Sequence, residues 1–199
     1  GEKIRIINNK NKWVSRGALK LEPIILIQKI IIKNKICLDI GASTGGFTQV
    51  LLKYGAKKIY SIDVGYGQIH ERIKTNKKVI SFERTNARYL TSKLINEYVD
   101  ILLCDASFIS IKKIINKPLE FLKNGGILIA LIKPQFEALQ KEIKRGGGVK
   151  DSTVHQRICD DIKDFLIKEK KLNVVNLMKS PIEGPKGNKE FFITAIKNF

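Results

Sequence analysis

The sequence predicts an α/β fold, with a seven-stranded, mostly parallel sheet that is covered by helices. Short runs rich in Ile, Leu and Val recur along the chain, and helical or polar stretches lie between them. Such alternation is typical of a parallel sheet whose strands are joined by crossover helices. The length of 199 residues fits one domain, and the 43% of hydrophobic residues can fill its core.

The apolar runs place the strands in order along the chain. We expect them at residues 35–40, 58–63, 78–82, 99–104, 126–132, 173–178 and 190–196. The connection between the last two, residues 180–188, is too short for a parallel crossover. The final strand pair is therefore expected to be antiparallel.

Two longer helices are indicated by apolar residues at helical spacing. The first follows the first strand, ends at Gly55 and carries Phe47, Val50, Leu51 and Tyr54. The second spans about 151–170 and presents Ile158, Ile162, Phe165 and Leu166 on one face. Both should pack their apolar faces against the sheet.

A further helix is expected near the start of the chain. Ser15 is a suitable N-cap for a helix through Ala18, Leu19 and Lys20, and Pro23 should break or restart it. This predicts a short or kinked helix. Residues 1–14 are expected to be a linker or the remnant of an upstream region, and residues 15–199 the main domain.

The chain is strongly basic. Its 37 Lys and Arg residues outnumber 19 Asp and Glu residues, which gives a net charge of +18 and favours a nucleic-acid or anionic-surface partner. Part of this charge gathers around a triple-glycine loop, at Lys141, Lys144, Arg145 and Lys150. Such a segment is suited to contact phosphates.

Several classes of protein are disfavoured. No apolar run approaches the ~20 residues of a bilayer span, and the first residues do not resemble a secretory signal, so we expect a cytoplasmic protein. The three cysteines form no C-x-x-C pair, and His70 and His155 stand far apart. Neither a disulfide framework nor a metal site is indicated.

The strongest motif follows the first strand, where Asp39 precedes a glycine-rich turn into a helix. Its glycines are spaced G-x-x-x-G-G, unlike the G-x-G-x-x-G of dinucleotide sites. An Asp just before the turn suits a cofactor with a positive amino-acid end, which indicates S-adenosylmethionine. The alternative is a turn that serves strand-to-helix geometry alone. The expected cofactor-binding residues here are Asp39, Gly41, Ala42, Ser43, Gly45, Gly46 and Phe47.

Two later residues extend this candidate site. Asp63 ends the second strand, where such folds hold ribose hydroxyls, although it could equally be a turn residue or helix cap. Asn86 follows the third strand and could contact the adenine edge, or it could simply form a turn.

Two charged residues end the fourth and fifth strands. Asp105 and Lys133 fall at the carboxyl edge of the sheet, where open α/β sheets bind ligands, and Asp105 is also expected to contact the cofactor. A neighbouring Asp105 favours the ammonium form of Lys133, whereas burial and nearby cations favour the amine. The sequence leaves both forms open.

Taken together, these motifs resemble the hemolysin A (TlyA) family of FtsJ-like ribose 2′-O-methyltransferases. The resemblance runs from about Trp13 to the C-terminus and rests on the turn at 39–47 and on segments 15–21, 63–68, 104–110, 132–137 and 184–191. It implies a Rossmann-like class I fold and transfer of a methyl group from S-adenosylmethionine to ribosomal RNA, on cytidines. Ribosomal RNA or ribosomal subunits are the implied partners.

The resemblance also implies a Lys-Asp-Lys-Glu catalytic tetrad, which falls on Lys20, Asp105, Lys133 and Glu190. Lys133 would be the base or the oxyanion stabiliser, and the other three would orient it and the ribose. Family members carry an S4-like RNA-binding domain upstream, so residues 1–14 are interpreted as a linker or as the remnant of that domain. Two alternatives stay open: a non-catalytic RNA-binding or ribosome-binding factor, and a membrane-active hemolysin.

Overall fold

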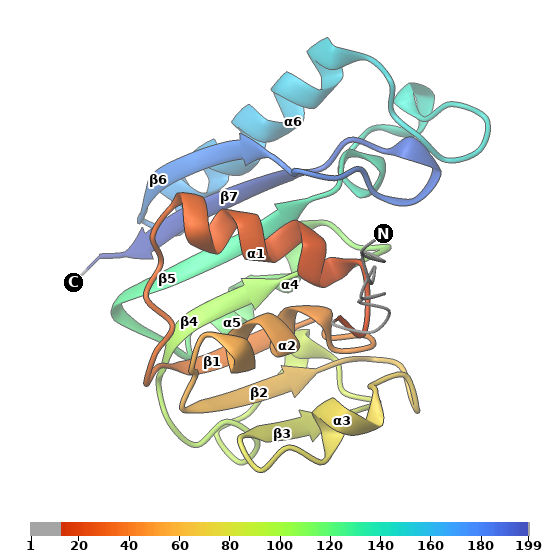
Figure 1. Cartoon of the computed structure of the whole chain (residues 1–199). Coiled ribbons are helices and arrows are strands. Elements are labelled where there is room, and N and C mark those ends of the chain that lie inside the picture. Colours follow the sequence, from red (N-terminus) through yellow and green to blue (C-terminus); the bar gives the residue numbers. More distant parts are fainter. Residues whose placement is uncertain (1–12, 199) are drawn as a thin grey trace, which may run out of the picture.

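The computed structural model describes residues 13–198 and contains one mixed sheet with helices on both faces (Figure 1). The strand order is β3-β2-β1-β4-β5-β7-β6. β7 runs antiparallel to both β5 and β6, and the other pairs are parallel. The strands are β1 (Ile36–Ile40), β2 (Lys58–Ile62), β3 (Val79–Phe82), β4 (Val99–Cys104), β5 (Leu122–Ile132), β6 (Leu172–Lys179) and β7 (Phe191–Lys197). The predicted α/β class, the seven strands and the antiparallel final pair are confirmed.

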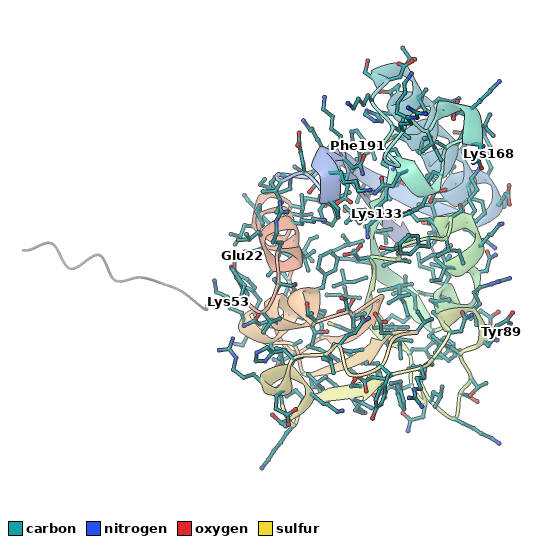
Figure 2. The ribbon with its side chains drawn as sticks, turned by 90° about the vertical axis from the view of Figure 1, so that its right-hand side faces the viewer. Glu22, Lys53, Tyr89, Lys133, Lys168 and Phe191 are labelled. Atoms are coloured by element: carbon teal, nitrogen blue, oxygen red, sulfur yellow. The ribbon has the colours of Figure 1, made fainter. Side chains whose placement is uncertain are left out.

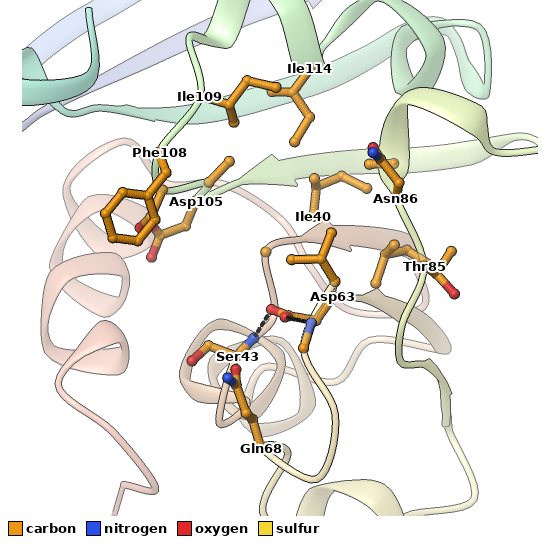
Figure 3. Close-up of a pocket in the computed structure, with 17 residues that line it drawn as sticks. Ile40, Ser43, Asp63, Gln68, Thr85, Asn86, Asp105, Phe108, Ile109 and Ile114 are labelled. Atoms are coloured by element: carbon orange, nitrogen blue, oxygen red, sulfur yellow. Dashed lines mark hydrogen bonds between the residues drawn. The ribbon is translucent and has the colours of Figure 1, made fainter.

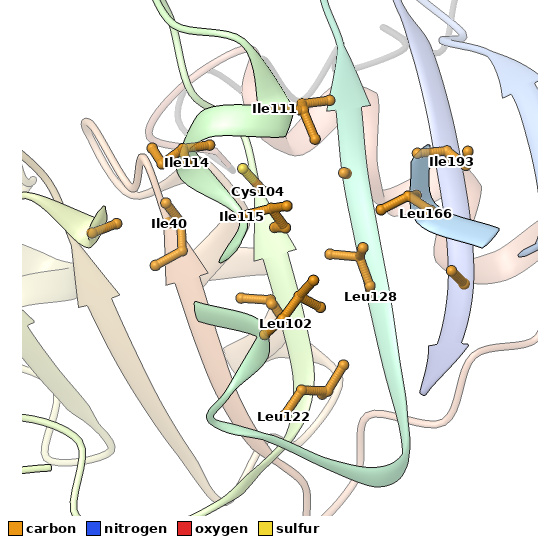
Figure 4. Close-up of a cluster of buried hydrophobic side chains, with 14 of the residues drawn as sticks. Ile40, Leu102, Cys104, Ile111, Ile114, Ile115, Leu122, Leu128, Leu166 and Ile193 are labelled. Carbon is orange, nitrogen blue, oxygen red and sulfur yellow. The ribbon is translucent and has the colours of Figure 1, made fainter. Parts of the chain in front are cut away.

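Each face of the sheet is covered by its own set of helices. On one face lie α1 (Gly17–Ile27), α2 (Gly46–Lys53) and α3 (Glu71–Lys74), whose apolar residues form one core cluster. On the other lie α4 (Ile111–Ile114), α5 (Asn116–Leu119) and α6 (Ser152–Asp164). Figure 4 shows part of this second cluster, in which Ile115 and Leu166 pack over Leu102 and Leu128. Because strand side chains alternate, neighbouring residues of one strand serve opposite clusters.

The N-terminal helix differs from its prediction. α1 is one helix of 11 residues that contains Pro23, and its N-cap is Arg16, with no capping hydrogen bond from a side chain. The expected cap at Ser15 and the break at Pro23 were therefore wrong. A proline inside a helix costs about 3 kcal/mol. The complete burial of Leu21 and Ile24 offsets that cost, because fully burying such a side chain contributes roughly 1.5–3 kcal/mol.

The helix predicted over 151–170 begins as expected and changes its winding near its end. The Asp151 carboxylate accepts a hydrogen bond from the Thr153 amide and caps α6, and a π-helical turn (Phe165–Glu169) follows. The four-residue helices α3, α4 and α5 had no periodic signal in the sequence. Most of the region predicted as a linker, residues 1–12, lies outside the described residues.

Between residues 13 and 198, no helix combines the length and the apolarity that crossing a membrane requires.

Candidate active site

A pocket of about 400 Å³ opens at the carboxyl ends of β1, β2 and β4 (Figure 3). Five of the sequence-predicted site residues line it: Gly41, Ser43, Asp63, Asn86 and Asp105. Its walls combine these polar groups with apolar side chains such as Ile40, Ile62 and Ile114. This mixture of a few polar groups on an apolar surface is typical of small-molecule sites.

The glycine turn is shaped by contacts within the protein. Gly41 has a φ of +79°, and a Cβ there would collide with the backbone carbonyl of Asp105. A Cβ on Gly46 would collide with the Ser15 hydroxyl, where α2 begins against the segment before α1. Gly41 therefore lies against the end of β4 while lining the pocket, and Gly46 lies against the segment before α1.

The rest of the turn does not line the pocket. Phe47 is a core residue that stacks on Phe192 with ring centroids 6.2 Å apart. Ala42 is buried, and a Cβ on Gly45 would meet the side chain of Ile73. These three residues, like Gly46, hold the turn in place around the pocket.

Asp63 joins the ends of two strands. Its Oδ2 accepts a hydrogen bond of 2.7 Å from the Ser43 amide, and its Oδ1 accepts one of 2.7 Å from the Gly65 amide (Figure 3). The carboxylate is half-buried and lines the pocket. Each oxygen keeps a second lone pair for a ligand hydroxyl.

Asn86 serves its turn and also lines the pocket. Its Oδ1 accepts a 3.0 Å hydrogen bond from the Arg88 amide and caps the short 3-10 helix Ala87–Tyr89. Because the side-chain oxygen is used in this way, the amide nitrogen is the group that remains for a ligand acceptor.

Asp39 is fully buried beneath the turn and does not line the pocket. Its Oδ2 accepts a 2.7 Å hydrogen bond from the Thr48 hydroxyl, which lies 2.7 Å from the Ser61 hydroxyl. Burial raises the pKa of Asp39 to about 7, and the nearby charges of Asp105 and Asp63 act in the same direction. The carboxyl group therefore changes charge near neutral pH, one layer below the pocket.

Lys133 and Asp105 form an ion pair at the pocket mouth. Lys133 Nζ lies 2.6 Å from Asp105 Oδ1, with both side chains largely buried at 11% and 20% exposure. Lys133 also donates a 2.9 Å hydrogen bond to the Ser107 hydroxyl. Only the contact with Ser107 has hydrogen-bond geometry, because Asp105 Oδ1 has no hydrogen-bond partner among the described residues. The ammonium group therefore keeps N–H groups for a substrate oxygen.

Lys20 and Glu190 form a second ion pair. Lys20 Nζ donates to Glu190 Oε1 at 2.6 Å, and the Glu190 side chain has no solvent exposure. Glu190 Oε2 is buried and has no hydrogen-bond partner among residues 13–198. A buried carboxylate oxygen without a partner is costly. A Cβ on Gly184 would collide with this oxygen, so the loop before β7 packs directly over it.

The sheet brings the two pairs together. Ile132 of β5 pairs with Phe191 of β7, so Lys133 and Glu190 flank adjoining strand ends. Figure 2 shows Lys133 and Phe191 in this region. The alternation of β5 and β7 places Leu131 and Phe192 on the α1 face, and continuing it by two residues assigns Lys133 and Glu190 to the same face. α1 delivers Lys20 to that face.

Phe108 is a pocket residue that the predicted site did not include. Its side chain is 89% exposed, its φ is +63°, and its ring centroid lies 5.0 Å from that of Phe136. A left-handed backbone at a large aromatic residue is rare and clusters at functional sites. The segment 104–110 had been noted as a motif, but an exposed ring cannot be distinguished from a core ring in a sequence.

Comparisons with known proteins agree with this geometry. The FtsJ-like methyltransferase model matches residues 13–197. Hemolysin A of Brachyspira hyodysenteriae is 40% identical over 96% of the chain and 79% of that protein. The 16S/23S rRNA (cytidine-2′-O)-methyltransferase TlyA of Mycobacterium tuberculosis is 37% identical over 94% of the chain and 70% of that protein.

A solved structure from Streptococcus thermophilus, described as a candidate hemolysin, superimposes with a TM-score of 0.90 at 36% identity. The superposition covers 96% of the chain and 69% of that protein. The chain belongs to the FtsJ-like methyltransferase family, among relatives of hemolysin A and TlyA.

Proposed function

We propose that the chain transfers the methyl group of S-adenosylmethionine to a ribose 2′-hydroxyl of ribosomal RNA, on a cytidine. The observation that carries this proposal is the pair of buried ion pairs, Lys133 with Asp105 and Lys20 with Glu190, beside the pocket. The name of the M. tuberculosis relative supports the same reaction and substrate. With a ribosomal substrate, the proposed location of the enzyme is the cytoplasm.

The pocket fits the adenosine part of the cofactor. The free lone pairs of Asp63 can accept the ribose hydroxyls, and the Asn86 amide nitrogen can donate to the adenine edge. Ile40, Ile62 and Ile114 offer apolar surface for the base. When bound, S-adenosylmethionine supplies an electrophilic methyl group on a positive sulfur.

Lys133 positions the nucleophile. Asp105 and Ser107 hold the ammonium group, and a remaining N–H can donate to the 2′-oxygen and stabilise the negative charge that develops there. In this arrangement Lys133 acts through its charge, and the hydroxyl proton leaves to solvent. The alternative, in which Lys133 takes up that proton, requires the neutral amine.

Lys20 and Glu190 hold the other side of the target ribose. Their pair fixes the ammonium group of Lys20, whose side chain is 10% exposed, so that it can donate to a ribose hydroxyl. Fixed groups on both sides of the ribose align the 2′-oxygen with the methyl group, which is the main requirement for this transfer.

Phe108 supports an RNA substrate. An exposed aromatic ring offers a stacking face to an unpaired base, and stacking of this kind contributes roughly 1–3 kcal/mol per base. The ring lies next in sequence to Ser107, which binds Lys133, so a stacked base would bring its ribose close to the ion pair.

The test is methyl transfer from radiolabelled S-adenosylmethionine to the RNA of isolated small and large ribosomal subunits. We expect label in RNA, and at the modified nucleotide a phosphodiester bond that resists alkali, because a 2′-O-methyl group removes the attacking hydroxyl. Lys133→Ala should give no label, whereas Lys77→Ala, at an exposed lysine remote from the pocket, should retain it. Cofactor binding without transfer to either subunit would favour the non-catalytic RNA-binding alternative.

A further inference from the structure

A second pocket, strongly basic, lies beside the proposed catalytic groups. It has a volume of about 400 Å³ and is formed by the loop at 144–150, before α6, and the loop at 186–189, before β7. Figure 1 shows these two loops side by side beyond the ends of β5 and β7. Its lining includes no acidic residue and five cationic ones: Lys144, Arg145, Lys150, Lys186 and Lys189.

The two loops are fastened to each other. Lys186 Nζ donates a 2.9 Å hydrogen bond to the Gly146 carbonyl, and the Lys144 amide donates one of 2.8 Å to the Gly148 carbonyl. Below them, the His155 ring nitrogen lies 2.7 Å from the Val149 carbonyl, and His155 is buried. The pocket therefore has a defined shape that does not depend on a ligand.

The remaining cations of the pocket form no ion pair among the described residues. Lys144, Arg145, Lys150 and Lys189 are exposed, and none forms an ion pair with another residue of 13–198. Glu142, the acid just before the loop, is already bound by Arg157 at 2.7 Å and 2.8 Å. Like charges held this close repel one another, and a bound polyanion removes that repulsion.

We propose that this basic pocket binds phosphates of the RNA strand that carries the methylated nucleotide. Lys189 directly precedes Glu190, so the pocket begins one residue from the groups assigned to the target ribose. Four unpaired cations match several successive phosphates of one strand better than a single small anion. The inference rests on the proposed RNA substrate and adds where its backbone runs.

The test compares two triple variants that lose the same charge. Lys144→Gln/Lys150→Gln/Lys189→Gln removes cations of the pocket. Lys77→Gln/Lys78→Gln/Lys93→Gln removes exposed lysines that precede β3 and β4, at the opposite edge of the sheet. Binding of a mixed-sequence, single-stranded oligoribonucleotide is measured over a range of NaCl concentrations, and S-adenosylmethionine binding is measured beside it.

The pocket variant should lower the slope of log affinity against log salt by about 2, and the affinity at 0.15 M salt by more than about tenfold. The control variant should change the slope and the affinity much less. The two variants should bind S-adenosylmethionine as well as the unmodified chain does. Equal losses in the two variants would overturn the proposal, because total charge alone would then explain the binding. If only the pocket variant loses RNA affinity, and the unmodified chain transfers no methyl group to ribosomal RNA, the phosphate site is supported and the proposed function is rejected.

Discussion

Lys20 Nζ lies 2.6 Å from Glu190 Oε1, so one buried ion pair joins the first helix to the start of the last strand. The two residues are separated by 170 positions in the sequence. The pair holds α1 against the reversed strand β7, and it also fixes Lys20 at the proposed ribose site. It therefore has a structural and a functional role that mutations can separate.

Breaking this pair should destabilise the fold. Lys20→Met leaves an unpaired buried carboxylate, and we expect urea unfolding to show a loss of about 3 kcal/mol in the free energy of unfolding. The double variant Lys20→Met/Glu190→Leu should recover much of that loss, because it removes both buried charges, yet methyl transfer should stay absent in both. As a control, Lys168→Met in the exposed pair with Asp164 should cost less than about 1 kcal/mol. Transfer by the double variant would contradict the role given to Glu190.

Lys133 variants should separate binding from chemistry. Lys133→Ala should lower kcat for methyl transfer by at least about a hundredfold, since a positioned charged group at the reacting oxygen is lost, and should leave S-adenosylmethionine affinity within a few-fold. The measurements are single-turnover methyl transfer and calorimetric titration of the cofactor.

The pH dependence of the remaining activity distinguishes the two roles of Lys133. If Lys133 acts as an ammonium group, Lys133→Arg should keep measurable transfer with the pH dependence of the unmodified chain, because arginine supplies the same positive charge. Transfer that is lost in Lys133→Arg at every pH, with cofactor affinity kept, would identify Lys133 as the base, because arginine cannot accept the proton. Unchanged transfer by Lys133→Ala would reject both roles.

Asp63 is predicted to control cofactor affinity. Asp63→Ala removes the acceptor for the Ser43 and Gly65 amides and for the cofactor ribose, so affinity for S-adenosylmethionine should fall by more than about tenfold. Asp100→Ala is the matched control. Asp100 also accepts a backbone amide between strands, from Ile36 at 2.8 Å, but at the opposite edge of the sheet. The control should lose stability and keep its affinity. Equal affinities in the two variants would remove Asp63 from the cofactor site.

Much of this site could be read from local sequence patterns. The run from Leu38 to Phe47 predicted a strand, a turn and a helix, and Asp105 and Lys133 were predicted at strand ends because each follows a continuous apolar run. These features depend on neighbours within a few residues. The order of the strands, with β7 between β5 and β6, depends on distant contacts that a single sequence does not display.

Several parts that were not predicted depend on residues far away in the chain. Gly41 meets the carbonyl of Asp105, and Gly46 meets Ser15, so the identity of their neighbours is set by tertiary packing. Asp39 lies on the opposite face of β1 from Leu38 and Ile40, and it is Ile40 that lines the pocket. The sequence does not show which of these two faces carries the pocket. Pro23 stays within a helix because of burial, which local propensity does not include.

The contact at Gly41 gives a further prediction. Gly41→Ala adds a Cβ that collides with the Asp105 carbonyl and also strains a left-handed backbone. Gly147→Ala is the control, because Gly147 has a φ of +85° and nothing within 4 Å of an added Cβ. Gly147→Ala should lower the free energy of unfolding by about 1–2 kcal/mol, through backbone strain alone.

Because of the additional clash, Gly41→Ala should lower the free energy of unfolding by at least about 1 kcal/mol more than its control does. Gly41→Ala should also lose cofactor binding. Thermal unfolding with and without S-adenosylmethionine measures both effects, since a bound ligand raises the midpoint. Equal stabilities for the two variants would show that the turn yields to the added methyl group.

The buried carboxyl group of Asp39 predicts an unusual dependence of stability on pH. Burial raises the pKa of Asp39 to about 7 in the folded chain, against 3.8 as its ordinary value. Between these two values the unfolded chain has lost the proton and the folded chain retains it. The free energy of unfolding therefore falls as pH rises through this window, by up to about 1.4 kcal/mol per pH unit, and levels off above pH 7.

Asp39→Asn should remove this contribution, so urea unfolding at pH 5, 6 and 7 should show a flatter profile than for the unmodified chain. Asp151 provides the control with the opposite sign. The Thr153 hydroxyl and amide lower the pKa of the exposed Asp151 carboxyl, so its stabilising effect is lost only as the pH falls below the ordinary range. Asp151→Asn should therefore leave the slope between pH 5 and 7 unchanged. An identical slope in Asp39→Asn and the unmodified chain would mean that Asp39 is ionised throughout this range, held by its hydrogen bond from Thr48.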